Sequence, residues 1–135
     1  MKITGCCLPY GESKYHDAIQ VGAFSHQDGK SVPLLRSFGR LNDPCNVIGH
    51  CILHDTATGV MCDIHFNPEY IERVDVDGWC SYNHIGAWAV ELKREPTLLH
   101  KLPSKFGNEY IVTYGRIAAV VFDRDCLEKV TIKED

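Results

Sequence analysis

The chain has 135 residues, 44% of them hydrophobic and 24% charged, with a formal net charge of -4 at pH 7. This composition excludes intrinsic disorder and predicts a single folded domain over residues 1–135. A pI near 5.9 leaves no excess of basic charge for a phosphate backbone, so we expect no nucleic-acid partner. The sequence has no apolar run of about 18 residues and no signal-like apolar start, so we expect no membrane span and production in a cytosol.

The chain has seven cysteines, and that compartment decides how we interpret them. An odd count and the adjacent pair Cys6 and Cys7 argue against a disulfide framework, because cytosolic thiols stay reduced. We expect most of them to be small buried apolar residues.

A zinc site is the alternative interpretation for Cys62, with His50, His54 and His65 as the other candidate ligands. On strands, residues two apart share a face, so the first two histidines would be aligned, whereas Cys62 and His65 would point to opposite faces. We therefore expect no metal and no cofactor.

The first third of the chain predicts short strands and turns. A first strand over "KITGCCLPYG" is closed by Pro9 and Gly11, and "DAIQVGAFSHQDGK" has a short helical turn near Ala23. Residues 32–35, "VPLL", are typical of a buried strand.

The clearest predicted element is an antiparallel hairpin over residues 46–67. Apolar and polar residues alternate in both halves, and "DTATG" between them supplies a turn with Asp55 and Gly59. Asn67 as N-cap and Pro68 at the first helical position then predict a short helix.

Two more strands are predicted after this helix. The first covers "CSYNHIGAWAVELKR", where period two separates two faces: Ile85, Ala87 and Ala89 on one, and Trp88, Val90 and Leu92 nearer the other. The last is a central strand over residues 110–122, because an apolar run such as 117–122 is typical of a strand buried on both faces.

Between these strands, "EPTLLHKLPSKFGNE" is a polar excursion in which Leu98, Leu99 and Leu102 are expected to form one amphipathic turn. Gly115 predicts a bulge or a close backbone approach. The sum is a β-rich α+β fold, a single mixed or antiparallel β-barrel with one or two short helices.

The order of these pieces resembles the caudoviral prohead proteases, relatives of herpesvirus assemblin. The "GAF" element, the "IGHCILHDTATGVMCDIHFN" hairpin and the closing "GRIAAVVF" fall in family order over nearly the whole chain. The resemblance implies a prohead-protease-like barrel. An active member needs a serine nucleophile, a histidine that takes its proton, and a third residue that orients the imidazole.

Two positions depart from that pattern. The family histidine follows the strand that matches "VPLL", but "RSFGRLND" has Phe38 and no histidine, and the serine position in "NHIGA" holds His84. Phenylalanine cannot accept a proton, and an imidazole cannot form the ester intermediate. The alternative is a shifted site of Ser81 with His84, or with His50 or His54 approaching from a neighbouring strand. It is weakened because Ser81 and His84 point to opposite faces of a strand.

Catalysis by a cysteine is a further alternative, with Cys80 or Cys51 as the nucleophile beside a histidine. Nothing in the sequence shows the electropositive setting that a low-pKa thiol needs.

We therefore expect a phage virion structural protein without enzymatic activity. In this interpretation it is a degenerate protease fold that binds and stabilises the head shell as a capsid cement or decoration protein. Its partners are the major capsid protein, other head proteins or a second copy, and it is assembled in the host cytoplasm. The alternative is an active prohead maturation serine protease that cleaves scaffold and capsid precursors.

Aromatic and leucine side chains on loops are the candidate partner-binding residues, because interfaces are built from such anchors. They are Phe38, Trp79, Tyr82, Leu98, Leu99 and Phe106. The alternative for these residues is satellite core beneath loops. For Trp79 and Trp88, strand alternation favours the core for one of the two.

Overall fold

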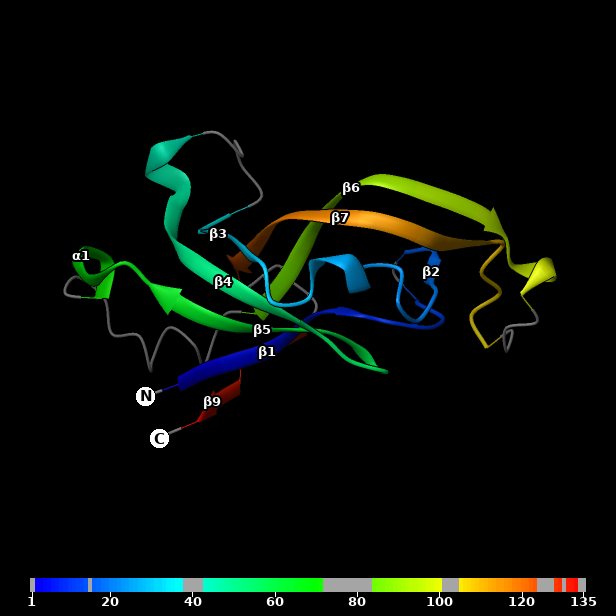
Figure 1. Ribbon diagram of the computed structural model, residues 1–135, viewed down its shortest axis with the longest axis horizontal. Helices are drawn as coiled ribbons and strands as arrows, with labels where there is room; N and C mark the ends of the chain where they lie inside the picture. Colours follow the sequence, from blue (N-terminus) through cyan, green and yellow to red (C-terminus); the bar gives the residue numbers. More distant parts are fainter. Residues whose placement is uncertain are drawn as a thin grey trace.

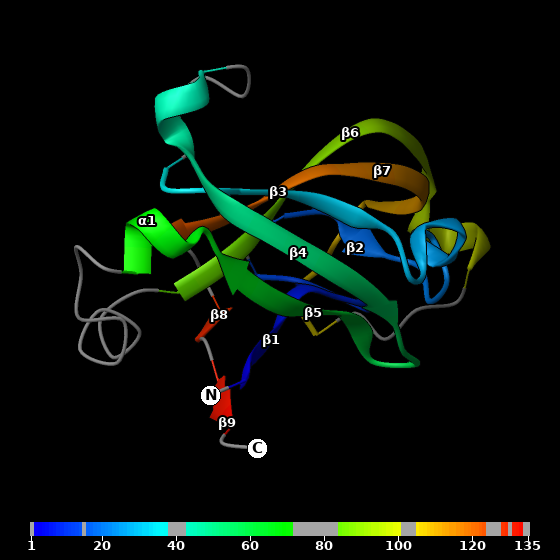
Figure 2. The same cartoon turned by 60° about the vertical axis from the view of Figure 1, so that its left-hand side comes forward.

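The computed structural model describes residues 2–14, 16–37, 43–71, 84–100, 105–123, 128–129 and 131–133. Nine strands form one mixed sheet. The sheet curls into half a barrel, with little helix (Figure 1, Figure 2). The predicted β-rich class is therefore confirmed, with a half-barrel in place of a closed barrel.

The strands are β1 (Lys2–Pro9), β2 (Ala18–Ile19), β3 (Ser31–Leu35), β4 (Val47–Asp55), β5 (Gly59–Phe66), β6 (His84–Pro96), β7 (Tyr110–Asp123), β8 (Glu128–Lys129) and β9 (Thr131–Lys133). The helical elements are α1 (Pro68–Ile71) and the 3-10 turns η1 (Ser25–Gln27), η2 (Pro44–Asn46) and η3 (Thr97–Leu99). The predicted first strand, the hairpin and the helix that begins at Pro68 are confirmed.

The order across the sheet is β8-β6-β7-β3-β4-β5-β1-β9, and β2 pairs with β7 outside this path. Strand β7 is central, as predicted, because it pairs with β6 on one side and with β3 and β2 on the other. The pairings of β7 with β2 and β3 are parallel and the remaining ladders are antiparallel. This mixture follows from the connections, since β3 and β7 are far apart in sequence.

The β4–β5 hairpin has the predicted turn chemistry. Thr56 N–H donates to the Gly59 carbonyl at 2.9 Å, and the Thr56 hydroxyl donates to the same oxygen at 2.6 Å. Along β4, Cys51 and Leu53 are buried, whereas Ile52 between them is half-buried and the flanking His50 and His54 are exposed. One face of the hairpin therefore supports the core and the other faces solvent.

The main core fills the inside of the curl, and a smaller cluster lies on the opposite face of β3 and β7. Leu34 belongs to the first and its neighbour Leu35 to the second, so this pair of strands is buried on both faces. Gln27 and Asn46 are the buried polar residues in the described part of the chain, and Gln27 shows how such a residue is satisfied. Its amide donates to the Ile117 carbonyl at 2.9 Å and its side-chain oxygen accepts from Ile117 N–H at 2.7 Å, which satisfies both groups.

The predicted faces of β6 are wrong at one position. Leu92 packs against the main core together with Ala87 and Ala89, although simple alternation placed it on the other face. The pairing with β7 shifts register between Val90 and Lys93, and Glu91 has φ = 56°. This irregularity reverses the alternation beyond it, because an extra residue moves every later side chain to the opposite face.

Candidate functional site

Two strand ends that flank the positions at which the resemblance implies catalytic residues lie at one end of the sheet. Leu35, the last residue of β3, pairs with Val121 of β7, and His84, the first residue of β6, pairs with Asp123 of β7. Because only β7 separates them, the end of β3 and the start of β6 are roughly 10 Å apart. These two strand ends are therefore close to each other in the sheet.

A cavity of about 560 Å³ lies near the end of β3, between η2 and α1. It is lined by Arg36, Pro44, Cys45, Val47, Ile48, Asn67, Glu69 and Tyr70. Burial raises the pKa of Tyr70, and the nearby Arg36 acts in the opposite direction. These described lining residues include no histidine or serine, so they do not supply a nucleophile with its base.

Several of the expected site residues lie outside the described residues, namely Phe38, Trp79, Tyr82 and Ser81, together with Cys80 and Leu102. Of the alternative catalytic set, His84 begins β6, whereas His50 lies on β4. Strands β7 and β3 stand between β6 and β4. The two strands are roughly 14 Å apart, so they are not the neighbours that a shared site requires.

The histidines proposed for zinc lie on the exposed face of the β4–β5 hairpin. His50 and His65 form a cross-strand pair with stacked rings, whose centroids are 4.9 Å apart. His54 Nε2 lies 2.8 Å from an Asp63 carboxylate oxygen. Cys62 is buried on the other face. In the described part of the chain no group of three His, Cys, Asp or Glu side chains could hold a metal ion.

Three cysteines lie in the core, as expected for small apolar residues: Cys7, Cys51 and Cys62. Hydrogen bonds from Cys51 and Cys7 lower the pKa of the Cys62 thiol, while the bond to Cys62 and burial raise the pKa of Cys51. Cys7 Sγ also donates to the Val60 carbonyl at 3.4 Å. None of the five described cysteines forms a disulfide.

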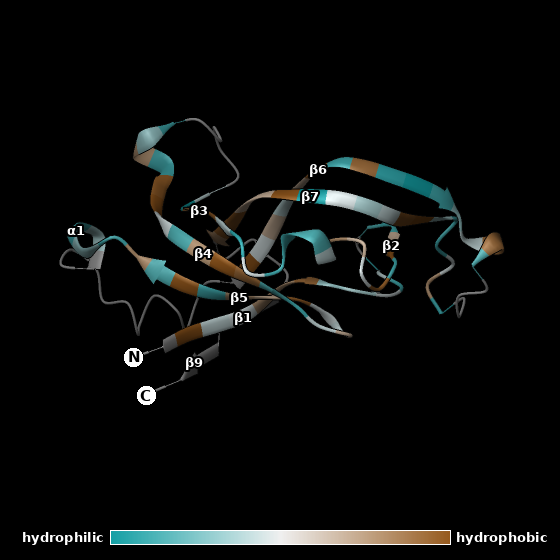
Figure 3. Cartoon of the chain, viewed as in Figure 1, coloured by the Kyte–Doolittle hydropathy of each residue, from teal (hydrophilic) through white to brown (hydrophobic). Residues whose placement is uncertain are grey.

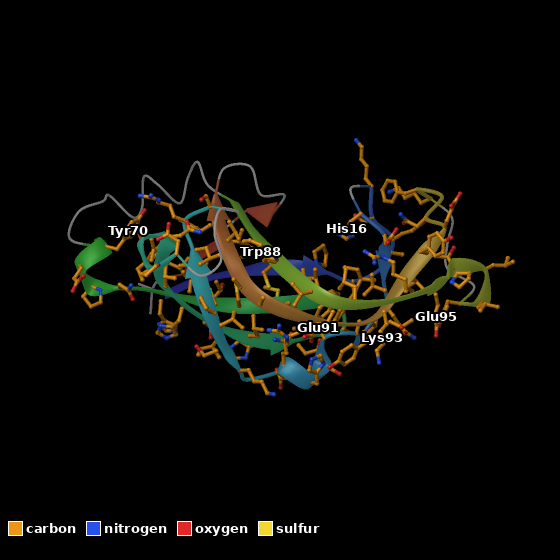
Figure 4. The ribbon with its side chains drawn as sticks, turned by 90° about the horizontal axis from the view of Figure 1, so that it is seen from above. His16, Tyr70, Trp88, Glu91, Lys93 and Glu95 are labelled. Carbon is orange, nitrogen blue, oxygen red and sulfur yellow. The ribbon has the colours of Figure 1, made fainter. Side chains whose placement is uncertain are left out.

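Six large apolar side chains are exposed in the described part of the chain, and four of them, all except Val21 and Tyr114, gather at the far end of the β6–β7 hairpin. Leu98 is 88% exposed and Leu99 72%, both on η3, while Phe106 is 45% and Tyr110 48% exposed. We call these four residues the hairpin tip. In Figure 3 the brown η3 follows a hydrophilic stretch of β6, and in Figure 4 the charged side chains of that stretch run toward the tip.

The hairpin tip is fastened to the segment of residues 12–16. The Glu12 carboxylate accepts hydrogen bonds from the backbone N–H of Lys105 at 2.7 Å and of Phe106 at 3.1 Å. The Asn108 side chain accepts from Ser13 N–H at 3.0 Å and donates to the carbonyls of Ser13 at 2.9 Å and His16 at 3.1 Å. The apolar side chains are therefore presented on a held backbone.

Next to the hairpin tip, Thr97 links the end of β6 to the residues that precede β7. Its N–H donates to the Glu109 carbonyl at 2.9 Å and its hydroxyl to the Asn108 carbonyl at 2.6 Å. Three expected partner-binding residues, Leu98, Leu99 and Phe106, lie here, and Tyr110 joins them. Sequence interpretation assigned Tyr110 only to a strand, because no local pattern distinguishes an exposed strand aromatic from a core one.

No family model, curated protein or solved structure matches the chain. Among the described residues, no helix has the length and apolar character required to cross a membrane.

Proposed function

We propose that the chain is a non-catalytic binding protein that acts as a cement or decoration protein of a phage head shell, on a prohead-protease-like fold. The hairpin tip carries this proposal. Its four apolar side chains are exposed although the half-barrel has a core of its own. Apolar side chains grouped on a surface are a feature of interaction sites.

The fastening of the tip supports a binding role. A flexible loop loses conformational freedom when it binds, and this loss reduces affinity. The hydrogen bonds of Glu12 and Asn108 to the tip region impose much of that order before a partner arrives. The partner we propose is the major capsid protein or another head protein, and the location is the virion after assembly in the host cytoplasm.

Two residues of the sequence and the strand order favour binding over proteolysis. Phe38 and His84 stand at the positions where the resemblance implies histidine and serine, and β6 does not neighbour β4, which carries His50. The alternative function, an active prohead maturation protease that uses Ser81, remains the competing hypothesis for the same topology.

The test compares matched truncations on the two hairpins. Purified head shells that lack the protein are mixed with wild type, with the double variant Leu98→Ala, Leu99→Ala, and with the control Thr58→Ala, Met61→Ala on the β4–β5 hairpin. After sedimentation, we expect the tip variant to lose roughly thirtyfold in affinity per interface-centre residue and the control to bind as wild type. Binding should persist in moderate salt, because the contacts are apolar.

Three outcomes would contradict the proposal: wild type that does not bind shells, an equal loss in the control variant, or release by moderate salt alone. Precursor cleavage by wild type that disappears in Ser81→Ala would establish the protease alternative. Self-association that depends on the two leucines would identify a second copy as the partner.

A further inference from the structure

A second cavity, separate from the hairpin tip, opens on the inner side of the half-barrel. Its volume is about 220 Å³. It is lined by Leu8, His16, Asp17, Ile19, Phe24, Ala87, Ala89, Leu92, Arg94 and Val112. This is room for about seven groups of the size of water. Packed interiors leave few voids larger than one water molecule, so the cavity is more than a packing defect.

The inner walls of the cavity are apolar. Seven of the ten lining residues are apolar, and Leu8, Ile19, Phe24 and Val112 among them are buried. Backbone features hold two walls in place: the irregularity at Glu91 turns Leu92 inward, and a Cβ added at Gly115 would lie 2.6 Å from Leu92 and 2.7 Å from the Phe24 ring. Alanine at Gly115 would therefore displace these two side chains.

The polar lining residues form the mouth of the cavity, because His16 and Arg94 are exposed and Asp17 contacts Arg94. Arg94 Nε donates to an Asp17 carboxylate oxygen at 2.6 Å, with 50% of the arginine side chain exposed. His16 Nδ1 lies 2.6 Å from the Asp17 carbonyl oxygen. Along the long axis of the molecule, His16 lies between Trp88 and Glu95 (Figure 4).

The contact with Asp17 orients the guanidinium group without using all of its donors. A guanidinium carries five N–H groups in one plane, and the bond to Asp17 engages the Nε side. The terminal nitrogens match the geometry of a second carboxylate. An apolar chamber with a few polar groups that fix orientation is a common arrangement for a small amphipathic ligand.

We propose that this cavity binds a small aliphatic monocarboxylate, whose hydrocarbon chain lies against Phe24, Ala89 and Leu92 and whose carboxylate accepts hydrogen bonds from the terminal N–H groups of Arg94. A chain of six to eight carbons corresponds to the room available. The site does not depend on the function proposed for the hairpin tip.

The first test measures the affinity of the folded wild-type chain for butanoate, hexanoate and octanoate by titration calorimetry. Each added methylene should strengthen binding by roughly fourfold until the cavity is full. Octylammonium and octanol, with the same chain, should bind at least about tenfold more weakly than octanoate, because they lack the carboxylate.

The second test compares two arginines of the same hairpin. Arg94→Gln should weaken octanoate binding by about tenfold or more. Arg116→Gln is the matched control: Arg116 is 47% exposed and also pairs with a carboxylate, Glu91 at 3.2 Å, but does not line the cavity. Ala89→Leu, which fills the cavity, should weaken octanoate binding more than Arg94→Gln does. Ala118→Leu, on the neighbouring strand, should leave octanoate binding unchanged.

The proposal is overturned if wild type binds none of the carboxylates at millimolar concentration, if octylammonium binds as tightly as octanoate, or if Arg116→Gln loses as much as Arg94→Gln. The chain-length and head-group series uses only wild type, so a variant that fails to fold does not prevent a decision. The double variant of the hairpin tip should retain octanoate binding, which separates this site from the tip.

Discussion

The two long hairpins of the sheet, β4–β5 and β6–β7, differ at their ends. The β4–β5 hairpin closes in a short polar turn, in which the N–H and the hydroxyl of Thr56 both donate to the Gly59 carbonyl. The β6–β7 hairpin has a longer connection that exposes Leu98 and Leu99 and is held by residues from elsewhere in the chain. Both ends receive hydrogen bonds from distant residues, Tyr10 and Asp28 at Asp55 of the first and Glu12 and Ser13 at the second, but only the first also has a short turn that closes on itself. The two exposed leucines thus lie at the end whose longer connection is held by distant residues.

The largest expected effect contrasts one leucine from each hairpin. Leu53 is completely buried in β4, so Leu53→Ala should lower the free energy of unfolding by about 3 kcal/mol. Leu98→Ala should change it by no more than about 0.5 kcal/mol, because an exposed side chain has little packing to lose. Urea denaturation measures both. Comparable losses would mean that Leu98 supports the fold and would remove the distinction between the hairpins.

A smaller loss is expected when the long-range support of the β6–β7 end is removed. Asn108→Ala deletes three hydrogen bonds to Ser13 and His16 and should cost about 2 kcal/mol. Proteolysis near the tip should accelerate at the same time. The control is Thr113→Ala, whose hydroxyl makes one long contact of 3.4 Å to the Lys93 carbonyl. An unchanged cleavage rate in Asn108→Ala would show that this side chain does not hold the tip.

The β4–β5 end should respond to alkaline pH through Tyr10. Burial and the hydrogen bond that its hydroxyl donates to Asp55 raise the pKa of Tyr10 in the folded state. Because the folded state favours the protonated phenol, this stabilisation is complete below the unfolded pKa of about 10 and declines as pH rises above it. Denaturation between pH 8 and 11 should show a decline that Tyr10→Phe reduces. Stability that increases over this range would contradict the assignment.

The smallest effect is expected on the outer face of the β4–β5 hairpin. Asp63→Asn removes the charge opposite His54, but the histidine side chain is about half exposed. Surface ion pairs contribute little, so stability should change by no more than about 0.5 kcal/mol. Thermal denaturation at low and high salt checks this. A loss of more than about 1 kcal/mol would mean that the polar face is structural.

Local pattern predicted most of the strands but not their long-range partners. Alternation and turn residues located the β4–β5 hairpin, because both signals lie within one short segment. Leu92 was assigned to the wrong face because the irregularity at Glu91 has no signature: glutamate rarely adopts positive φ.

The candidate site was predictable to a similar extent. Leu98, Leu99 and Phe106 were identified from apolar residues in a polar, proline-bounded stretch. The hydrogen bonds by which Glu12 and Asn108 support the hairpin tip were not predicted, because contacts between residues more than 90 positions apart leave no periodic signal in the sequence. The cavity near Arg94 was missed for the same reason, since its walls come from four separate strands.

The parallel pairing of β3 with β7 has a consequence for the order of folding. Leu34 pairs with Val120, which is synthesised about 86 residues later. At roughly 5–20 residues per second, this edge of β3 waits about 4–17 s for its partner on the ribosome. The antiparallel β3–β4–β5 unit can form during that interval. An apolar strand edge is exposed meanwhile, so nascent chains that stall before β7 should be the form of the protein most prone to aggregate.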